Sequence, residues 1–310
     1  MKRMAGGVWP TMVTPFTEQG EIDYAALERA IEWYIGCGVD GLFAVCQSSE
    51  MFRLSLEERV QLAAFVKRQA NGRVPVIASG HISDSFEDQV EELRAIAATG
   101  IDALVLITNR LAGEDESDAV WKSNLQKLLE AIPPHIALGF YECPFPYKRL
   151  IAPELLQWCA GTGRFLFLKD TSCDVDNMKA KLAAVQGTDL QIYNANSATL
   201  LETLKAGVTG YSGIMANFHP DLYVWLLRHW RQSPEEAEHL SCFLSMTSLI
   251  EKQLYPVNAK YYLMLEGVYA AMNCRTRSVL DFTATHRLEV EQLRRISKSY
   301  AERYPALTGR

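Results

Sequence analysis

The sequence predicts an α/β protein, a (β/α)8 TIM barrel with a C-terminal helical extension, on three observations. Eight short apolar stretches, each typical of a strand, begin near residues 8, 41, 74, 103, 136, 165, 190 and 210. One helical pattern lies between each pair, which gives the regular strand-then-helix units that such a barrel needs. Thr14-Pro15-Phe16 follows the first strand, where many doubly wound sheets carry a glycine-rich phosphate loop. We therefore expect residues 1–218 to form the barrel and residues 219–310, which show helical patterns only, to form a C-terminal helical domain.

Each element is recognised by its apolar pattern and by the residues that begin or end it. Residues 41–45 are apolar apart from a glycine, as expected of a strand buried on both faces. Asp23 caps the first helix and Gly36 ends it, and the capping box at 55–58 opens the second. Pro153 suits the first turn of a short helix. The expected strands cover 8–13, 41–45, 74–78, 103–107, 136–141, 165–169, 190–193 and 210–214, and the expected C-terminal helices cover 221–231, 234–253 and 280–301.

Composition and charge exclude several classes of protein. The 310 residues are 48% hydrophobic and 22% charged, which is ample for a globular core, and the net charge of -6 with no long basic run argues against a nucleic-acid partner. The sequence shows neither a secretory signal nor a stretch long enough to span a membrane. The seven cysteines are odd in number and form no C-x-x-C pair, and the six histidines lack metal-ligand spacing. We expect a cytoplasmic protein with no metal site and no cofactor.

One lysine occupies an unusual position. The four apolar residues 165–168 lead directly into Lys169, so this lysine ends a strand that is buried on both faces. Burial disfavours the ammonium form of lysine, and a partly neutral amine can attack a carbonyl carbon to form a Schiff base. The alternative is a lysine that emerges into solvent where the strand ends.

The other strand ends bring further polar groups to the same rim, because active sites of this fold lie at the C-terminal ends of the strands. Tyr141 ends the fifth strand and is expected next to Lys169, since neighbouring strands lie about 4.8 Å apart. A phenol there can move protons during Schiff-base chemistry, although a tyrosine at this place is often only a packing residue. Ser48 and Ser49, with their backbone N–H groups, could hold a carboxylate. Glu50 is either a solvated charge or a buried group that braces the loop. The remaining candidates for substrate binding are Gln47, Asn194, Ser212 and Gly213.

Three segments give the chain a family resemblance. The opening 10–16, the loop Cys46-Gln47-Ser48-Ser49-Glu50, and Tyr141 followed 28 residues later by Lys169 resemble motifs of the dihydrodipicolinate synthase and N-acetylneuraminate lyase family of class I aldolases. The resemblance runs from about residue 7 to residue 218. It implies a pyruvate-type 2-oxo acid bound as an imine on Lys169, with Tyr141 as the proton relay and with Ser48 and Ser49 holding the carboxylate. It also implies a homo-oligomer, a tetramer or a dimer.

The chain departs from the family pattern at three places. Cys46 and Ser49 replace the two glycines of the family's G-[ST]-T-G-E loop, and Gln47 replaces a hydroxyl residue of the proton relay. The tyrosine that the family donates across a subunit interface has no counterpart, since residue 109 or 110 falls there. The arginine that follows the fifth strand in the family's synthases is displaced here to residue 149, and the pocket is more aromatic, with Phe145 and Tyr147. These changes argue against dihydrodipicolinate synthase itself and predict a less acidic or more aromatic aldehyde partner.

The sequence therefore predicts a class I Schiff-base lyase or aldolase that joins or cleaves a 2-oxo acid and an aldehyde. Two alternatives stay open: a dehydratase acting on a 2-oxo sugar acid, and a barrel that binds a 2-oxo acid without turnover. A metal-dependent aldolase has little support, because no histidine or carboxylate cluster falls at the strand ends.

Overall fold

The computed structural model describes residues 3–305, and it confirms the predicted (β/α)8 barrel. Eight parallel strands lie in the order β1-β8-β7-β6-β5-β4-β3-β2, and a bridge between Thr11 and Phe43 brings the stretch after β1 against β2, so the sheet curls into a ring. The strands are β1 (Gly7–Val8), β2 (Leu42–Val45), β3 (Val76–Ala78), β4 (Ala103–Ile107), β5 (Leu138–Tyr141), β6 (Phe165–Asp170), β7 (Gln191–Asn194) and β8 (Gly210–Tyr211).

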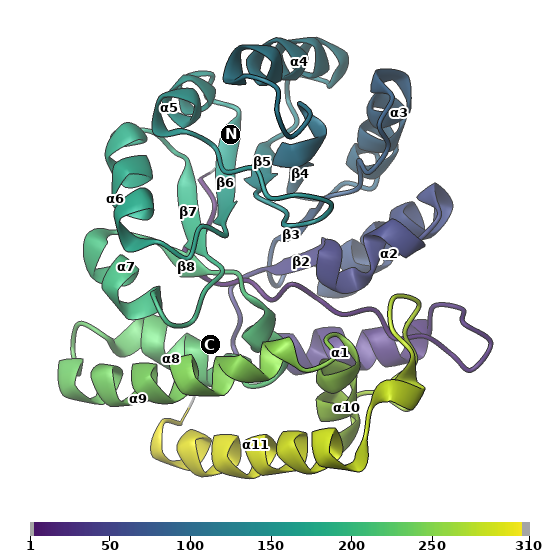
Figure 1. Cartoon of the computed structure of the whole chain (residues 1–310), viewed down its shortest axis with the longest axis vertical. Helices are drawn as coiled ribbons and strands as arrows, with labels where there is room; N and C mark the ends of the chain where they lie inside the picture. Colours follow the sequence, from purple (N-terminus) through teal and green to yellow (C-terminus); the bar gives the residue numbers. More distant parts are fainter. Residues whose placement is uncertain (1–2, 306–310) are drawn as a thin grey trace.

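A ring of helices surrounds the strands (Figure 1). Each strand is followed by one α-helix, and several begin at the side-chain caps expected from the sequence: Asp23 accepts from the Ala26 N–H, and Ser55 forms the capping box with Glu58. The helices of the ring are α1 (Tyr24–Gly36), α2 (Leu56–Ala70), α3 (Phe86–Ala97), α4 (Asp118–Ala131), α5 (Pro153–Gly161), α6 (Val175–Ala184), α7 (Leu200–Ala206) and α8 (Pro220–His229).

Aromatic side chains fill the interior of the barrel, and glycines make room for them. The rings of Trp9, Phe167 and Tyr193 pack together with centroid distances of 4.3 to 5.6 Å. A Cβ atom at Gly41 would lie 2.3 Å from the Trp9 indole, and one at Gly210 would lie 2.3 Å from the Tyr193 ring. The chain carries glycine at these two positions, just before β2 and in β8, because the large rings leave no space for a side chain.

The chain after the barrel is helical, as the sequence predicts, but its helices are divided differently. The helix expected at 234–253 ends earlier: α9 (Pro234–Thr247) gives way to the 3₁₀ helix η5 (Ser248–Lys252). The Thr247 hydroxyl donates to the Phe243 carbonyl one turn back, a contact that bends helices. Then follow α10 (Val257–Leu265) and α11 (Ala284–Arg303), which lie beside α1 and α8 in Figure 1.

The division into two domains at residue 218 stays a prediction. Helix α8, which begins two residues later, packs against β1 and so belongs to the ring of helices around the barrel. Within residues 3–305, no helix is both long and apolar enough to cross a membrane.

Candidate active site

The strand register brings Tyr141 and Lys169 together in the mouth of the barrel. Tyr141 at the end of β5 pairs with Lys169 on β6, and both side chains are only 4% exposed. The Lys169 Nζ lies 4.5 Å from the centre of the Tyr141 ring. The Lys169 amine makes no hydrogen bond or ion pair with any residue of the described chain, and its one specific side-chain contact there is with the Tyr141 ring.

The surroundings of Lys169 favour the neutral amine. Burial lowers the pKa of Lys169 from 10.5 to about 8, and the neighbouring groups Cys46, Cys143 and Glu251 oppose this shift. A lysine with a pKa near 8 has an appreciable neutral fraction at physiological pH, and the neutral amine is the nucleophile that a carbonyl carbon requires. Burial also raises the pKa of the Tyr141 phenol well above 10, so Tyr141 keeps its proton.

The loop after β2 forms a tight 3₁₀ turn, η1 (Gln47–Ser49), under the mouth. The Tyr141 hydroxyl donates to the Gln47 side chain at 3.4 Å, and the Ser48 hydroxyl donates to the Thr11 hydroxyl at 3.2 Å. Ser49 differs from Ser48: its hydroxyl donates to the Cys46 carbonyl and accepts from the Cys46 N–H, and it is fully buried. The structure therefore joins Gln47 to Tyr141 and Ser48 to Thr11, and it uses Ser49 to close the turn.

Glu50 braces the strand-two loop, which decides between the two interpretations that the sequence leaves open. Its carboxylate is 1% exposed and accepts from the Lys260 Nζ at 2.6 Å. The same carboxylate accepts from the backbone N–H groups of Arg275 and Thr276, both at 2.7 Å. The loop is thus tied to α10 and to the segment before α11, more than 200 residues along the chain.

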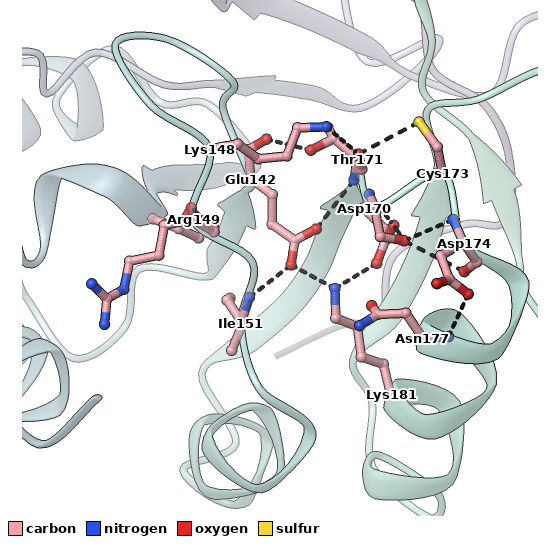
Figure 2. A network of polar contacts seen from close by, with 12 residues as sticks. Glu142, Lys148, Arg149, Ile151, Asp170, Thr171, Cys173, Asp174, Asn177 and Lys181 are labelled. Carbon is pink, nitrogen blue, oxygen red and sulfur yellow. Dashed lines mark hydrogen bonds and ion pairs between the residues drawn. The ribbon is translucent and has the colours of Figure 1, made fainter. Parts of the chain in front are cut away.

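A buried ion network is formed by Lys181 and by the residues that directly follow the two catalytic candidates in the chain, Glu142 and Asp170 (Figure 2). Side chains alternate along a strand, so Glu142 and Asp170 point away from the barrel interior, toward α6. There the Lys181 Nζ lies 2.6 Å from the Glu142 carboxylate and 2.6 Å from that of Asp170, and all three side chains are fully buried. Lys181 therefore joins β5, β6 and α6 and fixes the separation of Tyr141 and Lys169. This network was not predicted from the sequence.

The candidate residues at the ends of β7 and β8 differ in whether their polar groups already have hydrogen-bond partners. The Ser212 hydroxyl is buried and has no hydrogen-bond partner in the described structure, so it is available to a ligand. The Gly213 carbonyl accepts from the Thr11 hydroxyl at 3.5 Å. The Asn194 amide, in contrast, donates to Thr199 and Thr203, both at 2.9 Å, which points it toward α7. The Asn194 side chain is therefore directed away from the other candidates, although the Asn194 carbonyl accepts from the Ser212 N–H at 2.9 Å.

Hydrogen bonds connect the loop after β4 with the loop after β5. The Asn109 amide donates to the carbonyls of Cys143, Phe145 and Tyr147 at 2.5 to 2.9 Å, and the Tyr147 hydroxyl donates back to the Asn109 carbonyl at 2.7 Å. Phe145 is 50% exposed and packs edge-on against Phe52, with the ring centres 4.9 Å apart. Of the two aromatic residues expected to line the pocket, Tyr147 is therefore used to fix the loop.

Two residues near the mouth come from the C-terminal helical region and were missed by the sequence analysis. Glu251 lies on η5, and burial raises its pKa to about 7 against the attraction of Lys169. Tyr255 follows η5, and its hydroxyl accepts from the Asn217 amide at 3.3 Å. Pro256, which follows Tyr255, is the sequence feature that indicates an interruption of the helical pattern, because proline is unfavourable inside a helix.

The dihydrodipicolinate synthetase family model matches residues 4–296. The 4-hydroxy-tetrahydrodipicolinate synthase of Shewanella sp. strain MR-4 is 25% identical over 228 residues, which cover 71% of this chain and 73% of that protein. The same enzyme from Acidithiobacillus ferrooxidans strain ATCC 53993 is 28% identical over 221 residues, covering 71% of this chain and 73% of the relative.

A solved structure shares the fold over almost the whole chain. It is a prophage protein of the dihydrodipicolinic acid synthase family from E. coli K12, in complex with pyruvate. The two structures superpose with a TM-score of 0.85 at 22% identity, covering 94% of this chain and 98% of the other. At 22% sequence identity, this similarity is evidence for a shared fold.

Proposed function

This chain belongs to the dihydrodipicolinate synthetase family, and we propose that it is a class I lyase or aldolase that forms a Schiff base between Lys169 and pyruvate or a related 2-oxo acid. The observation that carries the proposal is the unpaired, buried Lys169, with its pKa lowered to about 8, against the ring of Tyr141. The pyruvate in the solved E. coli relative supports a 2-oxo acid as the ligand.

The proposed reaction begins with the neutral amine. The Lys169 nitrogen attacks C2 of the 2-oxo acid, the carbonyl oxygen takes up a proton, and loss of water gives a protonated imine. The cationic imine withdraws electrons from C3, so that C3 loses a proton and then bonds to the carbonyl carbon of an aldehyde. The aldehyde oxygen takes up a proton, and water releases the product from Lys169. Tyr141 hydrogen-bonds to Gln47 and moves the protons.

The groups around the mouth suit the 2-oxo acid end of such a substrate. We propose that the Ser48 hydroxyl and the unpartnered Ser212 hydroxyl bind the carboxylate, and that the buried Ser212 hydroxyl gains there the hydrogen bond that it lacks in the free protein. Gln47, which accepts from Tyr141, orients the phenol. Asn194 has no part in this proposal, since its amide is used by α7.

The displaced arginine argues against dihydrodipicolinate synthase itself. The Arg149 guanidinium donates to the carbonyls of Gly113 and Glu116 and to the Asp118 carboxylate at 2.8 to 2.9 Å, and Figure 2 shows it pointing away from the buried network. An arginine held in this way cannot bind the carboxylate of a second substrate. We therefore propose an aldehyde partner that differs from that of the synthases.

Borohydride trapping with pyruvate, read by intact and peptide mass, tests the proposal. We expect a reduced pyruvate adduct on Lys169 and no adduct in Lys169→Arg, which keeps the charge and removes the nucleophilic amine. Lys179→Arg on the surface of α6 is the matched control and should be trapped like the parent protein. An adduct with no turnover of any aldehyde would favour the 2-oxo-acid-binding barrel, and turnover of 2-oxo sugar acids alone would favour the dehydratase. Absence of an adduct with pyruvate and with longer 2-oxo acids would exclude Schiff-base chemistry.

A further inference from the structure

The segment after η5 brings a phenol close to the proposed carboxylate-binding residues. η5 packs against the 3₁₀ helix η4 (Ile214–Asn217), which follows β8. Tyr255 comes shortly after η5, and its hydroxyl oxygen lies 3.3 Å from the Asn217 amide nitrogen. The same nitrogen donates to the Thr11 carbonyl at 2.9 Å. The Tyr255 hydroxyl is therefore close to Thr11, in the stretch that follows β1.

Thr11 is the common neighbour of the hydroxyl groups in this part of the mouth. The Ser48 hydroxyl donates to the Thr11 hydroxyl at 3.2 Å. The Thr11 hydroxyl donates to the carbonyl of Gly213, the residue after Ser212, at 3.5 Å. The Ser48 hydroxyl is also a hydrogen-bond partner of the Tyr255 phenol, which holds the phenol pKa down against burial. Residues at the C-terminal ends of β1, β2 and β8 thus meet one residue of the C-terminal helical region.

The Tyr255 hydroxyl is only weakly engaged in the free protein. The Asn217 amide nitrogen carries two hydrogens, and the carbonyls of Thr11 and Ile214, both at 2.9 Å, already accept them. The longer contact with Tyr255 is therefore a shared one, and the Tyr255 O–H donates to no carbonyl or carboxylate of residues 3–305. Burial raises the pKa of the Tyr255 phenol well above 10, so this group keeps its proton and remains a donor.

The backbone before Tyr255 adopts an unfavourable conformation. Leu254 has a φ of 47°, in the left-handed region that a bulky side chain rarely adopts. The Leu254 carbonyl accepts from the Val257 N–H at 2.9 Å, which closes a tight turn around Tyr255. Such strain persists only where the surrounding structure enforces it, and it is concentrated at functional sites. The turn that directs Tyr255 toward η4 is thus maintained against a local cost.

We propose that Tyr255 is a third binding residue for the carboxylate of the 2-oxo acid, beside Ser48 and Ser212. The inference rests on the proposed function and adds to the same site a residue from outside the barrel strands. A carboxylate accepts several hydrogen bonds, and a donor binds it more strongly than it binds a neutral acceptor. The protonated imine on Lys169 lies next to this carboxylate and balances its charge, so the site needs donors and no further cation.

Borohydride trapping tests the role of Tyr255 without an aldehyde. The full-length protein is trapped over a range of concentrations of pyruvate and of pyruvamide, the neutral amide of nearly the same shape, and the half-maximal concentration is measured for each. Tyr255→Phe removes the hydroxyl and keeps the ring. Tyr261→Phe is the matched control, because the Tyr261 hydroxyl donates to the Glu291 carboxylate at the protein surface at 2.7 Å.

The carboxylate should feel the loss of the phenol more than the amide does. We expect Tyr255→Phe to raise the half-maximal concentration by at least about tenfold for pyruvate and by no more than about threefold for pyruvamide. The maximal rate of trapping should stay within about twofold of the parent, since Lys169 and Tyr141 are unchanged. Tyr261→Phe should behave like the parent with both compounds.

Two results overturn the inference: a half-maximal pyruvate concentration within about twofold of the parent in Tyr255→Phe, and an equal rise for pyruvate and pyruvamide. In either case, trapping of the parent on Lys169 leaves the Schiff-base mechanism standing. A parent protein that is not trapped by pyruvate or by longer 2-oxo acids loses the mechanism and the inference together. Equal thermal unfolding of Tyr255→Phe and the parent excludes a change of folding as the cause.

Discussion

Two buried lysines only twelve residues apart have opposite surroundings. Lys169 on β6 points into the barrel mouth, has no ion-pair partner in the described chain, and has its pKa lowered to about 8 by burial. Lys181 on α6 lies behind the same strand between Glu142 and Asp170, at 2.6 Å from each, and the attraction of these carboxylates raises its pKa despite burial. The comparison teaches that burial produces a nucleophile only where no carboxylate is at hand to hold the charge.

The two lysines also depend on each other. Glu142 follows Tyr141 and Asp170 follows Lys169, so the network around Lys181 holds the two strand ends from which the catalytic candidates project. Lys260, buried against Glu50, does the same for the strand-two loop. The paired lysines fix the geometry, and the unpaired lysine is left for the proposed chemistry.

Replacement of the unpaired lysine should have the largest effect on activity and the opposite effect on stability. Lys169→Met removes the nucleophile, so turnover should fall by at least about a thousandfold. It also removes a buried charge, and the shift of its pKa from 10.5 to about 8 corresponds to about 3 kcal/mol of stability gained at pH 7. Urea unfolding and a turnover assay measure both.

The sign of the stability change depends on pH. The folded-state pKa of Lys169 lies below the unfolded value, so the penalty is fully present below about pH 8 and disappears as the pH rises to 10.5. The gain from Lys169→Met should therefore shrink over that range. A variant that is less stable than the parent at pH 7 would contradict the account.

Replacement of the paired Lys181 should destabilise the protein, in contrast to replacement of Lys169. Lys181→Met leaves two buried carboxylates without their cation and should cost about 3 to 5 kcal/mol. The exposed Lys179→Met on the same helix is the control and should change stability by no more than about 0.5 kcal/mol.

The loss of stability in Lys181→Met should be smaller at acidic pH. Burial raises the pKa of Glu142 from 4.5 to about 7, although Lys181 opposes the shift, so the folded protein binds a proton more readily than the unfolded chain between these values. Removal of Lys181 enlarges this difference, and the loss should be smaller at pH 5 than at pH 8. Equal losses at both pH values would argue against buried carboxylates as the cause.

Removal of one neighbouring negative charge should lower the pKa of Lys169 further. The rate of imine formation should rise with pH and reach half its maximum near pH 8, the pKa of Lys169. Glu251 raises that pKa, so Glu251→Gln should move the profile to lower pH and make imine formation faster at pH 7. Stopped borohydride trapping from pH 6 to pH 10 measures the shift, and Glu235→Gln, at an exposed glutamate in the first turn of α9, should leave the profile in place.

The smallest effect on stability is expected at Ser212. Its hydroxyl has no partner, so Ser212→Ala should change stability by no more than about 0.5 kcal/mol, while KM for pyruvate rises several-fold. Ser197→Ala offers the contrast, because that hydroxyl bonds to the phenols of Tyr211 and Tyr223 at 3.1 and 2.6 Å, and its loss should cost about 1 to 2 kcal/mol. An unchanged KM in Ser212→Ala would remove Ser212 from the binding site.

Part of this arrangement could be read from the sequence because it depends on local pattern. Strand length, helix caps and the alternation of units predict the barrel and the neighbouring positions of Tyr141 and Lys169, and the register of β5 and β6 brings these two residues side by side. The roles of polar side chains in the loops were harder to predict from the sequence, because their hydrogen-bond partners depend on the groups that lie near them in the folded chain. Ser48 and Ser49 are adjacent and chemically identical, yet one reaches Thr11 and the other closes its own turn.

The sequence by itself determined the number and order of the strand and helix units and the strand ends that carry Tyr141 and Lys169, since apolar periodicity and capping are properties of neighbouring residues. The tertiary structure decided which polar groups are satisfied. Glu50 finds its cation 210 residues away on α10, and Glu142 and Asp170 share the amine of Lys181 on α6. The physical reason is that the charge state of a buried group is set by burial and by partners in space, which chain neighbours do not specify.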